Sequence, residues 1–440
     1  MTSPNEINTN GYRSALRQIL SMGSQQYFLD VFDEPDISID DFLNENIAQS
    51  PTLSASALHS RDLLAEIIAQ RTLAPVREIL GGLLVCPAIF TGPHCSLFVS
   101  LPTFVSRCLA IRAAAKRASP FALTYECSTV SLQSKNGVGP GWMEFKGTRH
   151  NVFGVPRQIR DSTAVCARHG IWRFNSLLGS PHGEVRDMAA RIASVQTTSP
   201  EEAIQQANDI LCGTETAGGQ PGLLSLADNQ TAGLVARHLT VGSVLSACVL
   251  DQNLRECLLE ELETHRARFP QLLPSSTELF WIISEGRRHP AKVADGRLQN
   301  SHMNFSLTLQ RDELVANLRA GRIVPNLLLT FMALCILPDL ACFGGHRQMI
   351  YIELFKAALG AALKRTRRFQ ETVGGKSVWL PDGLQPSCHP LSLLVAAPSP
   401  LALSINLLGT KFPRDLLPRT RLDYIDPHWY AAVTSNASQQ

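Results

Sequence analysis

The chain has 440 residues, of which 45% are hydrophobic and 18% are charged. This length is enough for two or three domains or for one large core. The low charged fraction predicts much buried surface, including an interface such as that of a homodimer. The 40 basic and 38 acidic residues leave a net charge of +2, which gives no field that would favour nucleic acid as a partner.

The apolar stretches and the cysteines argue against membrane insertion and export. Residues 1–12 are polar and do not resemble a signal peptide. The most apolar window, Pro325–Phe343, is broken by Pro338 and Asp339, and its uninterrupted part is shorter than the roughly 20 residues that cross a bilayer. Eleven cysteines are scattered without a Cys-x-x-Cys pair, as is typical of reduced thiols. We therefore expect a soluble, cytoplasmic protein without a membrane partner.

The first part of the chain predicts helices followed by a βαβ unit. Residues 1–78 form an N-terminal segment that is helical from about residue 13. Ile79–Phe90 is a continuous apolar run that predicts a buried strand, and Leu101–Arg117 has apolar residues at helical spacing. Phe121–Glu126 predicts a second buried strand. Strand, turn, helix and strand over about fifty residues indicate a parallel sheet with helices on its faces.

The remainder divides into three further segments. The first part of the core extends over 79–198, and a helical insertion or arm over 199–275 begins with the capping box of Ser199–Glu202. The second part of the core and the C-terminal elements occupy 276–430, and 431–440 is a polar tail that we expect to be disordered. Within 276–430 the pattern predicts a strand at Glu278–Ile283, a hairpin at Ser284–Gly296, a last apolar strand at Asn326–Leu337 and a helix at Gln348–Arg365.

Two turns between a strand and a helix are candidates for a binding site. They are Thr91–Ser96, which contains Gly92 and His94, and Phe343–Gln348, which contains Gly344, Gly345 and His346. Ligands of open parallel sheets gather at the carboxyl ends of strands, where helix N-termini favour carboxylate or phosphate groups. A histidine in each turn could bind an anion or transfer protons. Glycines that are needed only for tight turns are the alternative interpretation. Neither turn fits a P-loop or Gly-x-Gly-x-x-Gly.

Three other residues or patterns bear on chemistry. Glu126 ends the second predicted strand, where its carboxylate would face the same edge, although a surface glutamate fits the pattern equally well. Cys95 is either a thiolate at a helix start or a core thiol. No Gly-x-Ser-x-Gly string occurs, which argues against a Ser-His-Asp hydrolase. Cys388-His389 lacks a second Cys/His pair, so no metal site is predicted.

Several strings resemble, in one order over about residues 80–360, the bacillithiol cysteine-adding enzymes. Thr91–Phe98 is similar to an early Thr-Gly-Gln-Gln turn of that family, and Phe280 with Glu285–Pro290 is similar to a Gly-Arg-Arg hairpin. The longest match resembles the family's Ser-Pro-Asn-Val-Leu-Leu-Arg-Pro, Leu-Pro, Gly-Gly-Pro and Tyr strings, and consists of Val324–Leu329, Leu337-Pro338, Ala341–Gly345 and Tyr351.

This resemblance implies a Rossmann-like core with helical connecting elements and a coiled-coil arm that dimerises the family. The arm would be shortened here, because 200–270 shows no sustained heptads. The implied reaction is that of a ligase that joins cysteine to an amino sugar by an amide bond, with a nucleotide, ATP or ADP, in the fold. The turns and the resemblance together predict that the catalytic residues are His94, Glu126 and His346, and that the binding residues are Thr91, Gly92, Asn326, Gly344, Gly345, Arg347 and Gln348.

The chain departs from the family at the expected active site. Pro93-His94 replaces the Gln-Gln pair, the acidic string is reduced to Glu126–Thr129, and Gly-Gly-Pro becomes Gly344-Gly345-His346. Three hypotheses follow. The first is a divergent ligase that joins cysteine or a similar amino acid to an amine or sugar-derived acceptor. The second is a non-catalytic or regulatory subunit that keeps a Rossmann-like ligand site, and the third is a nucleotide-sugar binding protein.

Overall fold

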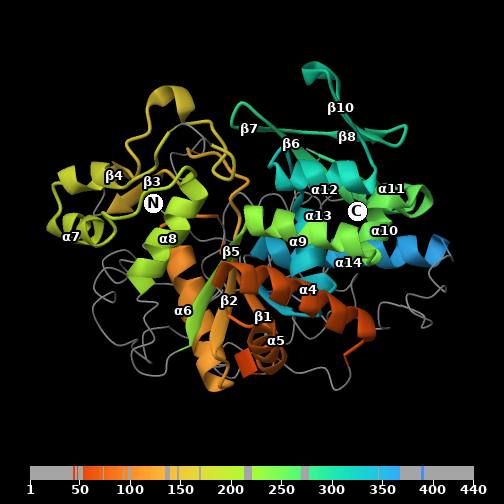
Figure 1. Cartoon of the computed structure of the whole chain (residues 1–440), viewed down its shortest axis with the longest axis horizontal. Helices are drawn as coiled ribbons and strands as arrows, with labels where there is room; N and C mark the ends of the chain where they lie inside the picture. The colour runs from red at the N-terminus through yellow and green to blue at the C-terminus, as the bar shows by residue number, and fades with distance from the viewer. Residues whose placement is uncertain are drawn as a thin grey trace, which may run out of the picture.

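The computed structural model describes residues 43–44, 47, 53–72, 74–92, 94–97, 101–133, 139–145, 148–167, 170–212, 221–268, 277–344, 346–366 and 388–390. A parallel sheet in the order β13-β12-β1-β2-β5 organises these residues (Figure 1). The strands are β1 (Ala88–Gly92), β2 (Phe121–Glu126), β5 (Gly222–Ala227), β12 (Ala341–Gly344) and β13 (Cys388–Pro390). This arrangement confirms the predicted α/β class with a Rossmann-like parallel sheet.

The strand order reverses between β1 and β12. The chain places β2 and then β5 on one side of β1, and it later returns to place β12 on the other side. The βαβ unit is confirmed: β1 and β2 are parallel neighbours, and the helix α6 (Leu101–Lys116) connects them and packs against both. The carboxyl ends of β1 and β12 therefore lie side by side at the point where the topology switches.

Helices cover both faces of the sheet, and each face has its own hydrophobic core. On one face, Phe90, Ala122 and Phe343 pack with residues of α6 and of the helices α7 (Gly183–Arg191) and α8 (Pro200–Cys212). On the other face, Ile89 and Leu123 pack with residues of several helices. These are α4 (Ala55–Thr72), α5 (Val76–Val85), α9 (Asp228–Val241), α10 (Val244–Leu250), α11 (Gln252–Arg268) and α14 (His346–Thr366).

The predicted strand over Ile79–Phe90 is wrong in its first half, which belongs to helix α5. Ile79, Gly82 and Leu83 are buried at helical spacing, and Pro87 ends the helix because a proline disfavours helical geometry in the residue before it. A Cβ on Gly82 would overlap the ring of Phe121. This glycine therefore lets α5 approach β2 closely, and it does not mark a turn.

Residues 199–275, predicted as a helical insertion or arm, contribute a strand to the sheet. Gly222–Ala227 forms β5, which pairs with β2 over its whole length. The helices that follow pack into the core, and α11 lies against α14, where Arg365 forms ion pairs with Glu260 (2.8 Å) and Glu261 (2.9 Å). In the described part of the chain, 199–275 therefore packs into the core and forms no separate coiled-coil arm.

The apolar stretch Asn326–Leu337, predicted as a strand, is helical. It forms α13 (Leu327–Phe331) and a π-helical turn (Met332–Ile336), which are largely buried. Asn326 Oδ1 caps the first helix by accepting a hydrogen bond from Leu329 N at 3.1 Å. The strand of this region is β12, four residues after Leu337. The prediction of a helix over Gln348–Arg365 is confirmed by α14.

The single hairpin predicted over Ser284–Gly296 is two consecutive antiparallel hairpins, with one turn at each end of that range. The first pairs β6 (Phe280–Ser284) with β7 (Arg287–His289), and the second pairs β8 (Lys292–Ala294) with β9 (Arg297–Asn300). Their turns, Glu285-Gly286 and Asp295-Gly296, have positive φ at both residues, as tight two-residue hairpin turns require. The strand β10 (Phe305–Thr308) pairs with β9, β11 (Ile323–Pro325) pairs with β6, and α12 (Arg311–Arg319) lies between β10 and β11 in the chain.

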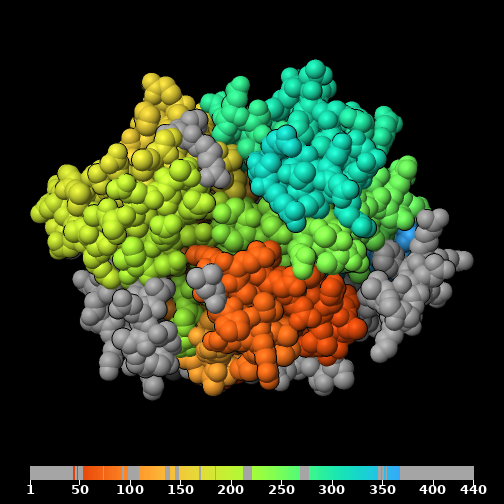
Figure 2. Space-filling view, viewed as in Figure 1, coloured from red at the N-terminus to blue at the C-terminus, as the bar shows by residue number. Residues whose placement is uncertain are grey.

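Two groups of elements flank the carboxyl edge of the parallel sheet. One contains β3 (Trp142–Phe145), β4 (Thr148–Asn151), α7 and α8, and the other contains β6 to β10 with α12. In Figure 2 the two groups form separate raised regions of the molecular surface, one yellow-green and one green to teal, and α9 lies between and below them.

Within the described residues, no single helix has both the length and the apolar character needed to cross a membrane. Helices α9 and α10 have the required length and apolar character only when they are taken together, and the two are bent by 86° at their junction.

Candidate functional site

The strand register brings several of the predicted site residues to one edge. Gly92 pairs with Glu126, and Glu126 pairs with Ala227 on β5. On the other side, Phe90 pairs with Phe343, and their rings stack with centroids 4.7 Å apart. The ends of all four strands β12, β1, β2 and β5 therefore contribute residues to one continuous edge.

Three of the predicted binding residues contact one another directly. The Thr91 hydroxyl donates a hydrogen bond to Gln348 Oε1, and its oxygen lies 3.3 Å from the carbonyl oxygen of Phe343. A Cβ on Gly344 would overlap both Gln348 Oε1 and Thr91 Oγ1. Gly344 is therefore required because the Gln348 side chain packs over it. This contact fixes the first turns of α14 against the end of β1.

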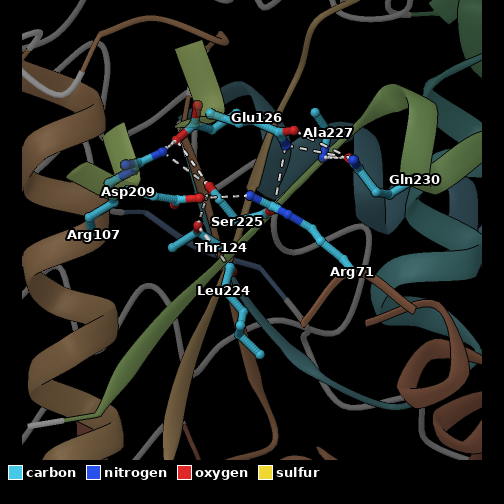
Figure 3. Close-up of polar contacts among 10 residues, drawn as sticks. Arg71, Arg107, Thr124, Glu126, Asp209, Leu224, Ser225, Ala227 and Gln230 are labelled. Atoms are coloured by element: carbon cyan, nitrogen blue, oxygen red, sulfur yellow. Dashed lines mark hydrogen bonds and ion pairs between the residues drawn. The ribbon is translucent and has the colours of Figure 1, made fainter. Parts of the chain in front are cut away.

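Glu126 is enclosed in the protein and forms an ion pair. Its side chain is 2% exposed and that of its partner Arg107, from α6, is 1% exposed. Arg107 Nε donates to Glu126 Oε1 at 2.8 Å, and Arg107 Nη2 contacts the same oxygen. Ser225 Oγ lies 3.3 Å from Oε1 and 2.9 Å from Thr124 Oγ1 (Figure 3). The alternative of a surface glutamate is therefore wrong.

Burial raises the pKa of Glu126, and the charge and hydrogen bonds of Arg107 act in the opposite direction. All of its hydrogen bonds in the described structure reach Oε1, and Oε2 is buried without a donor there. The ion pair was not predicted from the sequence. The available signal was Arg107, a charged residue flanked by Val105, Cys108 and Leu109 within the helix.

A second buried carboxylate, Asp228, holds the loop that follows β2. Asp228 is the first residue of α9. Its Oδ1 accepts a hydrogen bond from the Tyr125 hydroxyl at 2.6 Å, and its Oδ2 accepts from the backbone N–H of Ser128 at 2.8 Å and of Thr129 at 2.5 Å. Because these donors come from β2 and the residues just beyond it, Asp228 fixes the path of the chain as it leaves the sheet.

Glu201, in the first turn of α8, is the third buried acid. Its Oε1 lies 3.0 Å from Ser128 Oγ and accepts from the backbone N–H of Asn229 at 3.2 Å. Burial, followed by the charge of Asp228, raises the pKa of Glu201 to about 8. At neutral pH this carboxyl group therefore carries a proton for most of the time.

An arginine of the β6–β7 hairpin also reaches this edge. Arg288 Nη1 donates to the carbonyl oxygen of Thr129 at 2.5 Å, and its guanidinium lies 4.6 Å from the ring centre of Trp281. The hairpin is held further by Thr163, whose N–H donates to the carbonyl of Gly286 at 2.8 Å. The loop after β2 is thus fixed from both flanking groups of elements.

His94 of the predicted site and the nearby Cys95 have different surroundings. His94 is exposed just beyond β1. Cys95 is fully buried, and burial together with the charges of Glu126 and Glu201 raises its pKa well above that of a free thiol. The core-thiol interpretation of Cys95 is therefore confirmed.

The remaining predicted residues lie at the start of α14 or outside this edge. His346 and Arg347 are the first two residues of α14, directly beyond β12. Gly345 lies outside the described residues. Asn326, predicted to bind a ligand, uses its side chain to cap α13.

The described edge combines groups that can bind an anion with groups that can hold a proton. The start of α14 and Arg288 suit an anionic group, whereas Glu201 and the exposed His94 can exchange protons. In the part of the chain that the structure describes, no group of three or more His, Cys, Asp or Glu side chains is arranged to hold a metal ion.

No family model and no curated protein matches the chain. The resemblance to the cysteine-adding enzymes, which depends on collinear strings over residues 80–360, therefore stays a prediction.

Proposed function

We propose that this protein is a small-molecule ligase that joins cysteine or a similar amino acid to an amine or a sugar-derived acceptor. The observation that supports this most is the reversal of strand order between β1 and β12, with a glycine at the end of each strand. Open parallel sheets bind their ligands at this point. The collinear strings of the sequence add the ligase chemistry to this binding position.

The residues at the edge divide into two roles under this proposal. The start of α14, with His346 and Arg347, binds the anionic group, a phosphate of ATP or ADP or the carboxylate of the amino acid, through backbone N–H groups and the helix dipole. His94, which is exposed at the end of β1, acts as the general acid or base of the amide-forming step.

One observation favours the alternative of a non-catalytic subunit. Glu126, predicted as a catalytic carboxylate, is held by Arg107 in the interior and has 2% of its side chain exposed. Arg107 occupies Oε1 and holds the carboxylate in the interior, which is a structural role that requires no chemistry. Under this alternative the edge binds the ligand and no bond is formed.

The two functions differ in an assay of the full-length chain. We expect that incubation with L-cysteine, D-glucosamine and MgATP yields a product with the summed mass of the two substrates less one water, detected by mass spectrometry. His94→Ala should lower the rate of this reaction by about 10²–10⁴-fold. His302→Ala, which changes an exposed histidine of another sheet region, is the matched control and should leave the rate unchanged.

The outcomes are distinct. A rise in melting temperature with ATP, ADP or cysteine and no product with any acceptor would support the non-catalytic subunit. If neither product nor a rise in melting temperature is found, both functions are contradicted.

The proposal includes a cytoplasmic homodimer. It is supported by the low charged fraction and by cysteines that form no disulfide, among them Cys86, Cys95 and Cys248. We expect sedimentation of the full-length chain to give twice the monomer mass. A monomer mass that does not change with protein concentration would contradict the dimer.

A further inference from the structure

Glu126 has small neighbours on both sides at the carboxyl edge of the sheet. The register pairs it with Gly92 on β1 and with Ala227 on β5. Side chains of paired residues in a parallel sheet project from the same face. The row of these three residues therefore carries one side chain larger than a methyl group, and that side chain is a carboxylate.

The two oxygens of this carboxylate have different surroundings. Oε1 accepts from Arg107 Nε at 2.8 Å and lies 3.3 Å from Ser225 Oγ. Oε2 is buried, and no donor among the described residues reaches it. Figure 3 shows Arg107 and Ser225 gathered around one end of the carboxylate. A buried polar atom without a partner is costly, so the position beside Oε2 suits an N–H group from a ligand.

The charge around this position indicates which kind of N–H group fits. Four ionisable groups influence the buried thiol of Cys95: the carboxyl groups of Glu126, Glu201 and Asp228, and the guanidinium of Arg107. All four are nearly or fully buried. Glu201 Oε2 is also buried without a donor among the described residues. Because Glu201 is protonated at neutral pH, two ionised acids, Glu126 and Asp228, face the cation of Arg107, so a positively charged donor balances the charge better than a neutral or anionic one.

We propose that Glu126 Oε2 binds the primary ammonium group of the substrate, which belongs either to an amino acid or to an amino sugar. This inference rests on the proposed function, because a ligase that joins cysteine to an amine has one such group on each substrate. It gives Glu126 a binding role that is compatible with its ion pair, since Arg107 occupies Oε1 and leaves Oε2 for the ligand.

Calorimetric titration of the full-length chain with two matched pairs of probes tests this inference. One pair is L-cysteine and 3-mercaptopropionate, and the other is D-glucosamine and D-glucose, so that the members of each pair differ by the amino group. We expect the aminated member of one pair to bind about 10–100-fold more tightly, as a charge-assisted hydrogen bond provides. The pair that shows this preference identifies the source of the ammonium group.

Two variants assign the preference to Glu126. Glu126→Gln removes the charge and should reduce the preference to less than about two-fold, while the binding of ADP stays unchanged. Because Glu126→Gln also weakens the ion pair with Arg107, Gly92→Ala is the second variant. It keeps the pair, adds a methyl group to the row beside the carboxylate, and should weaken binding of the aminated probe about ten-fold. Glu202→Gln, a half-exposed neighbour of Glu201, is the control and should bind as wild type does.

The inference is overturned if wild type shows no preference in either pair, or if both variants keep it. These results are separate from the test of the proposed function. If the wild type forms product but shows no preference for the aminated probe, the ammonium-binding inference is contradicted and the ligase function is supported. If the wild type prefers the aminated probe but forms no product, the ammonium-binding inference is supported and the ligase function is contradicted.

Discussion

Ser128 lies between two buried carboxyl groups and has one hydroxyl proton for both. Its Oγ is 3.0 Å from Glu201 Oε1 and 3.2 Å from Asp228 Oδ2, and it accepts the N–H of Asp228 at 3.2 Å. Since a hydroxyl donates one hydrogen bond, both contacts are satisfied when Glu201 carries a proton and donates it to Ser128. This geometry agrees with the pKa of Glu201, which is raised to about 8.

The retained proton makes the stability of the fold depend on pH. The folded pKa of Glu201, about 8, lies above its ordinary value of 4.5. The protonated group therefore stabilises the fold fully below about pH 4.5, and this contribution is lost as the pH rises to about 8. Glu201→Gln keeps a donor to Ser128 at every pH, so we expect this variant to exceed wild type in free energy of unfolding by about 1–3 kcal/mol at pH 8.

Urea denaturation at pH 5, 6.5 and 8 measures this difference. The gap between Glu201→Gln and wild type should widen with pH, whereas Glu202→Gln, in the same first turn of α8, should show no widening. A gap that is the same at all three pH values would mean that Glu201 is ionised in the folded protein.

Arg107 and Glu126 form the second residue-scale test. Removal of one partner leaves an unpaired charge in the interior, so Arg107→Leu should lower the free energy of unfolding by about 3–5 kcal/mol. The double variant Arg107→Leu/Glu126→Leu has no buried charge at this position and should recover most of that loss. Chemical denaturation of both variants checks the prediction. It fails if the double variant is less stable than Arg107→Leu alone.

The sequence predicted where Glu126 lies and not what it contacts. Its place at the end of β2 follows from the local pattern of Phe121–Glu126. Its partner Arg107 belongs to another element, the helix α6. Packing of α6 against the sheet brings the Arg107 side chain to Glu126, and residue spacing along the chain does not reveal this packing. The same applies to Asp228 and Glu201, which begin two helices and meet only through Ser128.

At the scale of elements, the long periodic patterns were assigned correctly, whereas among the short apolar runs β2 was assigned correctly and α5 and α13 were not. Helices α6, α8 and α14 have periodic apolar residues over three or more turns, and all were predicted. The ten residues of α5 and the five of α13 are apolar runs that periodicity cannot assign to helix or strand. β5 was missed because its six residues stand within a region that is otherwise helical.

Adjacent glycines of α5 give a prediction at this scale. Gly81 and Gly82 are both helical, but a Cβ on Gly82 would overlap the Phe121 ring, whereas a Cβ on Gly81 meets no atom within 4 Å. We expect Gly81→Ala to raise the free energy of unfolding by about 0.5–1 kcal/mol through helix propensity. Gly82→Ala should lower it by about 1–3 kcal/mol through overpacking.

Thermal denaturation followed by circular dichroism compares the two glycine variants. Phe121→Leu, combined with Gly82→Ala, removes the overlapping ring and should recover part of the loss. Equal effects of Gly81→Ala and Gly82→Ala would show that α5 does not pack closely on β2.

At the scale of the whole molecule, one sheet joins two hydrophobic cores. Leu109 of α6 lies in the core on one face, and Leu239 of α9 lies in the core on the other face, and both are fully buried. The segments that the sequence analysis separated at residues 79, 199 and 276 all contribute strands to this sheet. Neither core can therefore lose its packing without exposing the strands that support the other.

We accordingly expect a single cooperative unfolding transition. Leu109→Ala and Leu239→Ala should each lower the free energy of unfolding by about 2–5 kcal/mol, as large-to-small changes in a core do, and each should shift the same transition. Urea denaturation followed by tryptophan fluorescence reports on the five tryptophans, among them Trp172 in the core of Leu109, and far-ultraviolet circular dichroism reports on all helices. Coincident midpoints in wild type and both variants would support one unit. Two separated transitions, each moved by one variant, would show that the faces of the sheet fold independently.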